Sequence, residues 1–197
     1  MTTSANPLAA YNIAAQLLTC ASDQVAEAWA DVDPELSLAR QCVVWGAIAW
    51  DQCECGQLVV SIAEQYPSHT FPTPATAPTA TNVAQNRCGA NIWVIRYEVS
   101  ILRCVPVQDD QGNPPECSAL DEAAQVAARD AWAVRTGIGC CLADLSRDLL
   151  PNGSTEIADY LIQDQPSRGP EGGCAGSSLN LLVGIRNCLC PPGAGSS

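Results

Sequence analysis

The sequence contains no lysine, one histidine, one phenylalanine and no long apolar run. The nine basic residues are all arginine, and against 21 acidic residues they leave a formal net charge of −12. Such a surface repels phosphate backbones and anionic membranes, which argues against a groove that grips DNA or RNA. No stretch approaches the roughly 20 apolar residues that span a bilayer, so we expect no membrane contact.

Signals for export and for common enzyme chemistry are also missing. The first twenty residues have neither the basic segment nor the apolar core of a secretory signal. No phosphate loop, dinucleotide fingerprint or nucleophile elbow occurs. The single histidine, His69, lies in a proline-rich segment with no cysteine placed beside it for a nucleophile pair. We therefore predict a protein without catalytic residues and without a cofactor.

Twelve cysteines are abundant for a chain without an export signal. Cytosolic proteins rarely keep disulfides, which leaves metal sites, free thiols, or a particle made inside a cell and later exposed to oxidising surroundings. The close pairs could in principle hold zinc, but they lack the usual C-x₂₋₄-C spacing: Cys53 and Cys55, Cys140 and Cys141, and Cys188 and Cys190. We therefore predict no metal ligands, and disulfides fit this pattern better.

One long strand is expected at the centre of the fold, within residues 88–107. Alternate residues on one of its faces are apolar, the period of a strand with one buried face: Trp93, Ile95, Tyr97, Val99 and Ile101. The opposite face is mixed: Val94, Arg96, Glu98, Ser100 and Leu102. This mixed face is expected to be exposed to solvent or to contact a neighbouring subunit.

Two amphipathic helices are expected, over residues 7–31 and 118–145, because apolar residues recur there at spacings of three and four. Asn6 is a good cap before Pro7 in the first helix. Gly137 and Gly139 could kink or interrupt the second helix.

Further strands are expected at residues 40–50, 57–66 and 179–185. Within 57–66 one apolar face holds Leu58, Val60, Ile62 and Tyr66, with Glu64 as an exception. Residues 156–162 are predicted to form a short helix, and residues 165–176 a Pro/Gly loop.

The chain is expected to form a single domain over residues 1–197, with 47% hydrophobic residues and a length that lets a domain bury about 70% of its extended surface. A proline-rich loop is predicted at 67–87 and a mobile tail at 191–197. The order of elements predicts an α+β fold. In it, an N-terminal helix and a second long helix pack on an antiparallel or mixed sheet of about four strands.

A disulfide is predicted between Cys104 and either Cys53 or Cys55. In a hairpin that joins residues 57–66 to the central strand, the start of the first strand lies near the end of the second. This places Cys53 or Cys55 within bridging distance of Cys104.

Several short motifs resemble those of small structural proteins of phages that infect actinobacteria. They are C-x-C-G-Q-L-x-V from Cys53, Tyr-Pro at 66–67, R-C-G at 87–89, R-C-V-P at 103–106, and G-C-x-G-x-x-L-x-L-x-V-G-x-x-x-C from Gly173. The resemblance, over about residues 46–190, is to tail terminators at the head–tail junction of long-tailed phages. The high cysteine count is not a requirement of that family.

Membership of that family would imply no catalysis. A terminator forms a six-membered ring that caps the tail tube and docks it to the head connector. The implied partners are copies of the same chain, the tail tube protein and the connector, and DNA only passes through the ring. The implied location is the virion, after assembly in the host cytoplasm. Closed rings use heterologous interfaces, and our candidate interface residues are Arg96, Glu98 and, in the proline-rich loop, Phe71.

Three other interpretations remain open. A neighbouring neck or connector subunit, or a tail tube protein, belongs to the same particle, and a connector would form rings of about twelve. A zinc-binding interaction module would use the cysteine pairs. An enzyme with a cysteine nucleophile would depend on His69, whose isolation argues against it.

Overall fold

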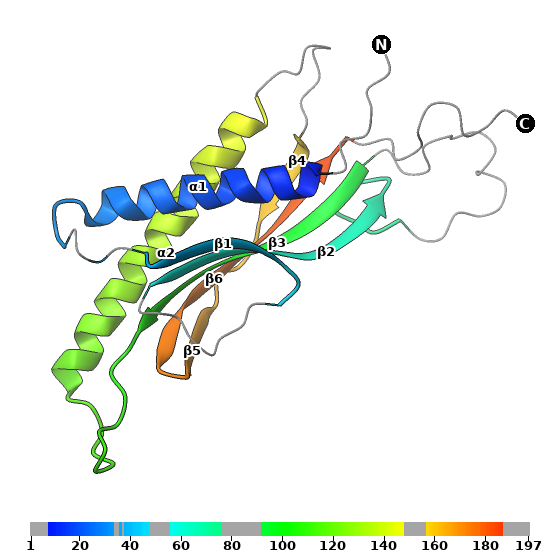
Figure 1. Ribbon diagram of the computed structural model, residues 1–197. Coiled ribbons are helices and arrows are strands. Elements are labelled where there is room, and N and C mark those ends of the chain that lie inside the picture. Colours follow the sequence, from blue (N-terminus) through cyan, green and yellow to red (C-terminus); the bar gives the residue numbers. More distant parts are fainter. Residues whose placement is uncertain are drawn as a thin grey trace, which may run out of the picture.

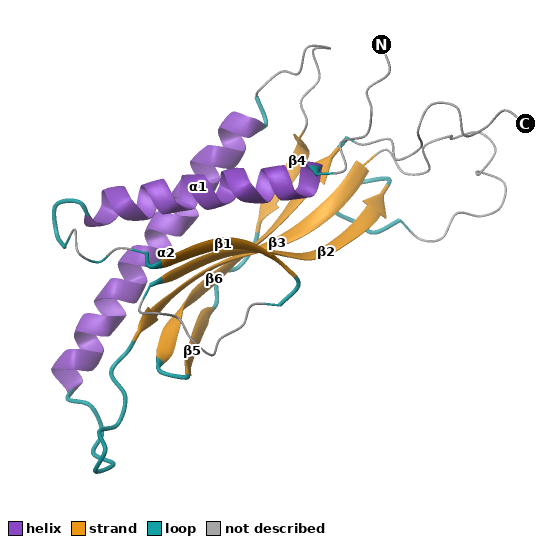
Figure 2. Ribbon diagram, in the orientation of Figure 1, coloured by secondary structure: helices purple, strands orange, loops and turns teal. Residues whose placement is uncertain are grey.

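The structure is a computed structural model that describes residues 8–33, 36, 38–47, 56–75, 92–147 and 157–186. Two helices lie over one face of a six-stranded sheet (Figure 1; Figure 2). The elements follow in the order α1 (Ala9–Trp29), β1 (Arg40–Trp45), β2 (Gln57–Ser68), β3 (Ile92–Cys104), α2 (Cys117–Leu145), β4 (Ile157–Ile162), β5 (Ser167–Glu171) and β6 (Cys174–Ile185). The α+β prediction, with an N-terminal helix and a long second helix on a mixed sheet, is confirmed.

The strands lie in the order β1-β2-β3-β6-β4, and β5 also pairs with β6. Strand β3 therefore occupies the middle of the sheet, as its long alternating pattern predicts. Strand β1 runs parallel to β2, and every other pair is antiparallel. A parallel edge strand on an otherwise antiparallel sheet makes the sheet mixed.

The hydrophobic core lies between the sheet and the helices. The predicted apolar face of β3 points into it: Ile95, Tyr97, Val99 and Ile101 are buried, and Trp93 packs against the same cluster. From α1 the cluster receives Ile13, Leu17 and Val25, and from α2 it receives Val134, Ile138 and Leu142. The Tyr97 hydroxyl donates to the Ala10 carbonyl at 2.9 Å, so the centre of the sheet is also fixed to α1 by a polar contact.

Two sequence predictions were wrong about secondary structure. Residues 156–162 were expected to be helical, but Ile157–Ile162 is strand β4. The predicted loop at 165–176 contains strand β5 and the first residues of β6. Strands β4 and β5 raise the sheet from about four strands to six.

Because β2 contains a bulge, the Tyr66 side chain lies on the opposite face from the one predicted. The register shifts between Ile62 and Glu64, so Glu64 pairs with Arg96 and Tyr66 pairs with Val94. Tyr66 therefore does not share the core face with Leu58 and Ile62, as its spacing suggested. A bulge inserts one residue and exchanges the faces beyond it.

Helix α2 is continuous through both of its interior glycines. A Cβ at Gly137 would lie 2.7 Å from the Cys20 carbonyl oxygen and 2.9 Å from Gln24 Cβ, whereas at Gly139 the nearest atom is 3.9 Å away. Gly137 is thus the point at which α2 crosses closely over α1. It is a packing contact rather than the interruption that the sequence suggested.

The two glycines predict opposite effects of substitution by alanine. Gly137→Ala is expected to lower the free energy of unfolding by about 1–3 kcal/mol, because the added methyl overpacks the helix crossing. Gly139→Ala, the matched control, is expected to raise it by about 0.5–1 kcal/mol, because alanine loses less backbone entropy in a helix. Urea unfolding of both variants measures the difference. Equal effects would contradict a close crossing at Gly137.

Candidate interaction surface

The face of the sheet opposite the core, called the far face here, carries no helix among the described residues (Figure 1). Its side chains come from alternate positions of β2, β3 and β6. Phe71 packs at one end of it, where a Cβ on Gly184 would lie 2.9 Å from the phenyl ring. Strand β5 supplies Arg168, which lies on this face beside Ser178 of β6.

Four charged side chains form what we call the charged patch: Glu64, Arg96, Glu98 and Arg168. Arg96 pairs with Glu64 at 3.2 Å, and their side chains are 47% and 53% exposed. Arg168 pairs with Glu98 at 2.9 Å, with 38% and 24% exposure. Arg96 and Glu98 stand two residues apart on β3, so they project from the same face of one strand.

Neutral polar groups support the patch from within the sheet. Ser100 and Ser178 share a hydrogen bond of 2.6 Å between β3 and β6. Arg168 Nε donates to the Ser178 hydroxyl at 3.1 Å, which fixes the guanidinium over the strand pair. Arg168 is therefore held by contacts with both a serine and an acid, whereas Arg96 pairs with Glu64 and remains half exposed.

Tyr66 lies beside the Arg96–Glu64 pair. Burial raises the pKa of the Tyr66 hydroxyl above its ordinary value; Arg96 acts in the lowering direction and Glu64 in the raising one. The hydroxyl donates to the Pro72 carbonyl at 2.8 Å. This bond ties the turn that carries Phe71 to β2, so the turn and the charged patch belong to one surface.

The three predicted interface residues, Arg96, Glu98 and Phe71, all lie on the far face, but they come from different segments of the chain. Arg96 and Glu98 lie in the charged patch, as their parity on the strand indicated. Phe71 packs on Gly184 of its own chain and is half-buried. The part of the proline-rich segment beyond residue 75 lies outside the described residues.

The cysteine predictions meet the structure only in part. Cys104 is disulfide-bonded, while Cys53 and Cys55 lie outside the described residues, so their pairing with Cys104 stays a prediction. Cys174, which lies opposite Cys104 in the register of β3 and β6, is disulfide-bonded as well. Free thiols occur at Cys42, Cys117 and Cys140, the last two of them exposed.

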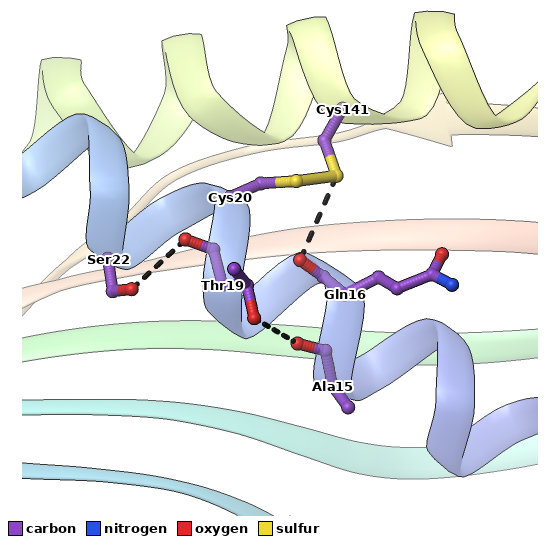
Figure 3. Close-up of a disulfide and its surroundings, with 6 residues drawn as sticks. All are labelled: Ala15, Gln16, Thr19, Cys20, Ser22 and Cys141. Carbon is purple, nitrogen blue, oxygen red and sulfur yellow. Dashed lines mark hydrogen bonds between the residues drawn. A yellow bond between two sulfur atoms is a disulfide. The ribbon is translucent and has the colours of Figure 1, made fainter.

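A disulfide that the sequence did not predict joins the two helices, from Cys20 on α1 to Cys141 on α2 (Figure 3). Its Cα atoms are 6.0 Å apart and the two residues are separated by 121 positions. Cys141 Sγ lies 3.8 Å from the Gln16 carbonyl oxygen. This is a contact only, since a disulfide sulfur carries no hydrogen to donate. A shallow groove beside the bond is lined by Ala15, Gln16, Thr19, Cys20, Cys141, Asp144 and Leu145.

A buried polar cluster, also missed from the sequence, joins β3 to both helices. Arg103 Nε donates to Asp130 Oδ2 at 2.7 Å, and the two side chains are 7% and 1% exposed. Trp29 Nε1 donates to Asp130 Oδ1 at 2.7 Å, and Arg103 also donates to the Leu36 carbonyl at 3.1 Å. Its burial and its hydrogen bonds within the chain indicate a structural link rather than a binding site.

Neither a metal site nor a membrane span occurs in the part of the chain that the structure describes. No three His, Cys, Asp or Glu side chains gather there as metal ligands. The close pairs Cys53/Cys55 and Cys188/Cys190 lie outside that part. Neither described helix combines the length and apolarity needed to cross a bilayer.

Two comparisons with known proteins found no match. The chain matches no protein-family model, and it matches no curated protein.

Proposed function

We propose that this chain is a structural subunit of a phage particle, a tail terminator that assembles into a ring, caps the tail tube and docks it to the head connector. The observation that carries the proposal is the charged patch on the far face. It is partly exposed, contains equal numbers of acids and bases, and lies on the sheet face that no described helix covers. Such a surface suits contact with another subunit.

The energetics of the patch support an interaction role. Solvent-exposed ion pairs contribute only about 0–1 kcal/mol to folding, because water and salt screen them. The half-exposed pair Arg96–Glu64 therefore adds little to stability. Charges arranged across an interface favour the correct partner and orientation instead.

The charge of the whole chain fits passage of DNA through the ring. With a net charge of −12 and no lysine, the subunit repels a phosphate backbone. DNA can then move through the ring without being held. The proposed partners are further copies of this chain, the tail tube protein and the head connector. The number of six copies comes from the resemblance alone, and no cofactor is proposed.

The disulfides fit a particle that is assembled in the host cytoplasm and later released. Reducing conditions in a cytoplasm disfavour disulfides, whereas a virion meets oxidising surroundings after lysis. Cys20–Cys141 and the bonds at Cys104 and Cys174 would then form or persist in the finished particle. We place the protein in the virion, at the head–tail junction.

Charge reversal at Arg96 tests the ring and the role of the patch together. Wild-type protein is expected to show sixfold end-on views by electron microscopy. Arg96→Glu places three acids together and is expected to abolish the ring, while the circular dichroism spectrum stays unchanged because the site is half exposed. Twelvefold views would favour a connector instead, and the absence of rings from wild-type protein would overturn the proposal.

The matched control exchanges the two charges of the pair. Glu64→Arg with Arg96→Glu restores an ion pair within the chain and alters only what a neighbour meets. If Arg96 contacts the next subunit, the exchanged variant also fails to form rings. Recovery of rings would show that the pair acts only within its own subunit and would remove Arg96 from the interface.

A further inference from the structure

Strand β1 forms an edge of the sheet. It pairs with β2 alone among the described strands. The Arg40 N–H bonds to the Gly56 carbonyl and the Gly46 N–H to the Ile62 carbonyl, each at 3.0 Å. By strand alternation, the backbone groups of Gln41, Val43 and Trp45 then point outward. No described residue bonds to them there.

The other border of the sheet, formed by β4 and β5, is protected against pairing with a further strand, unlike β1. Strand β4 has a register shift between Ile157 and Asp159, and the Asp159 carboxylate accepts the Tyr160 N–H at 2.9 Å. Strand β5 continues this border and contains Pro170. Bulges, charges and proline are the devices that prevent strands from pairing edge to edge.

Apart from the charge of Arg40 at its first residue, strand β1 has none of these devices. All six of its residues pair with β2 without a register shift, and its sequence RQCVVW contains no proline, lysine or acid. Trp45 is 74% exposed at its end. A regular, apolar edge of this kind is a template for another strand.

We propose that β1 pairs antiparallel with β1 of a second copy of this chain, around a twofold axis through Val43. In this register Gln41 lies opposite Trp45 of the partner subunit, and Val43 lies opposite its own copy. All the outward backbone groups are then used, in about six N–H···O bonds. On the far face Cys42 lies opposite Val44 of the partner subunit.

The charge distribution of β1 lets a second copy occupy this edge without like-charge repulsion. Copies of a chain with a net charge of −12 repel one another over most of their surface. The only charge on β1 belongs to Arg40, and the twofold axis holds the two Arg40 side chains at opposite ends of the pairing. No like charges meet in the strand pair, and Trp45 gains the aliphatic part of the partner's Gln41 as a packing surface.

This contact differs from the proposed ring and does not depend on it. A closed ring uses two different patches on each subunit, whereas a twofold contact uses the same patch on both. Pairing through β1 therefore joins two free subunits, or one ring to another. The sixfold end-on view expected for the ring is the same in either case.

A designed cross-link reports the register directly. Val44→Cys, in a Cys117→Ser/Cys140→Ser background, places a new thiol opposite Cys42 of the second copy. Facing residues of a non-hydrogen-bonded antiparallel pair have Cα atoms about 4.5 Å apart, within the range of a disulfide. Glutathione disulfide oxidises these two thiols to a disulfide and is itself reduced to two glutathione thiols. We expect most of the protein as a covalent dimer on non-reducing gels. Peptide mapping should find Cys42 bonded to the introduced thiol at position 44.

Two further measurements complete the test. Trp45→Lys adds a charge to the edge at a solvent-exposed site, and should raise the dissociation constant of the dimer about tenfold or more without a change in the thermal stability of the monomer. A Val44→Cys protein that stays monomeric, or that links Cys42 to Cys42, would overturn the proposed pairing. Sixfold rings without the cross-link would overturn the pairing alone, and cross-linked dimers without rings would overturn the ring alone.

Discussion

Replacing Cys141 with serine is expected to lower the free energy of unfolding by about 3–5 kcal/mol. The bond to Cys20 joins residues 121 positions apart. In the chain-entropy account, a loop of about 100 residues contributes roughly 4.7 kcal/mol, because the cross-link restricts the unfolded chain. The same bond ties α1 to α2 next to the close crossing at Gly137. Urea unfolding followed by tryptophan fluorescence measures the loss.

Cys140 provides the matched control, since it is the adjacent residue of the same helix but is free and exposed. Cys140→Ser is expected to change stability by no more than about 0.5 kcal/mol. Cys20→Ser should equal Cys141→Ser, and the double variant should equal either single one, because both remove the same bond. Additive losses would mean that the two cysteines act through separate contacts, and the disulfide assignment would fail.

The long elements of the fold could be predicted because their patterns are long. Strand β3 and the two helices carry many regularly spaced apolar residues, and each lies close to its predicted range. Strand β4 was mistaken for a helix for a physical reason. The register shift between Ile157 and Asp159 breaks its alternation. It leaves Ile157, Tyr160 and Leu161 at the three- and four-residue spacing of a helix.

Strand β5 carries no apolar pattern at all. Its sequence SRGPE contains a glycine and a proline, which are turn residues in isolation. Pairing with β6 holds it in an extended form at the border of the sheet, where proline is tolerated. Only the tertiary partner makes this segment a strand, so its local sequence carries no signal for it.

The surface residues and the buried cluster differ in how far the sequence could reveal them. Arg96 and Glu98 alternate with the apolar residues of β3, and this alternation was sufficient to place them on the face away from the core. The same alternation places Arg103, two residues after Ile101, on the apolar face, where an arginine needs a buried partner. An acid is available at Asp130 on the buried stripe of α2. The sequence therefore contains a signal for this buried pair.

Loss of that acid gives the second large effect: Asp130→Ala is expected to lower the free energy of unfolding by about 3–5 kcal/mol. Removing one partner of a buried ion pair takes away the opposite charge that compensates the other partner in a poorly solvated site. Arg103 would lose its hydrogen bonds to the two carboxylate oxygens, and Trp29 Nε1 would lose its acceptor. The end of β3 would then be less firmly attached to α1 and α2. Thermal and urea unfolding measure the loss.

Two controls separate this effect from ordinary loss of a charge. Glu64→Ala removes the acid of the exposed pair with Arg96 and should cost no more than about 1 kcal/mol, because water already screens that pair. Asp130→Leu combined with Arg103→Met removes both buried charges. It should be more stable than Asp130→Ala, since an apolar pair carries no uncompensated charge. If the double variant is no more stable than the single one, the cost at Asp130 comes from packing or from Trp29, and the ion pair is not the link between β3 and α2.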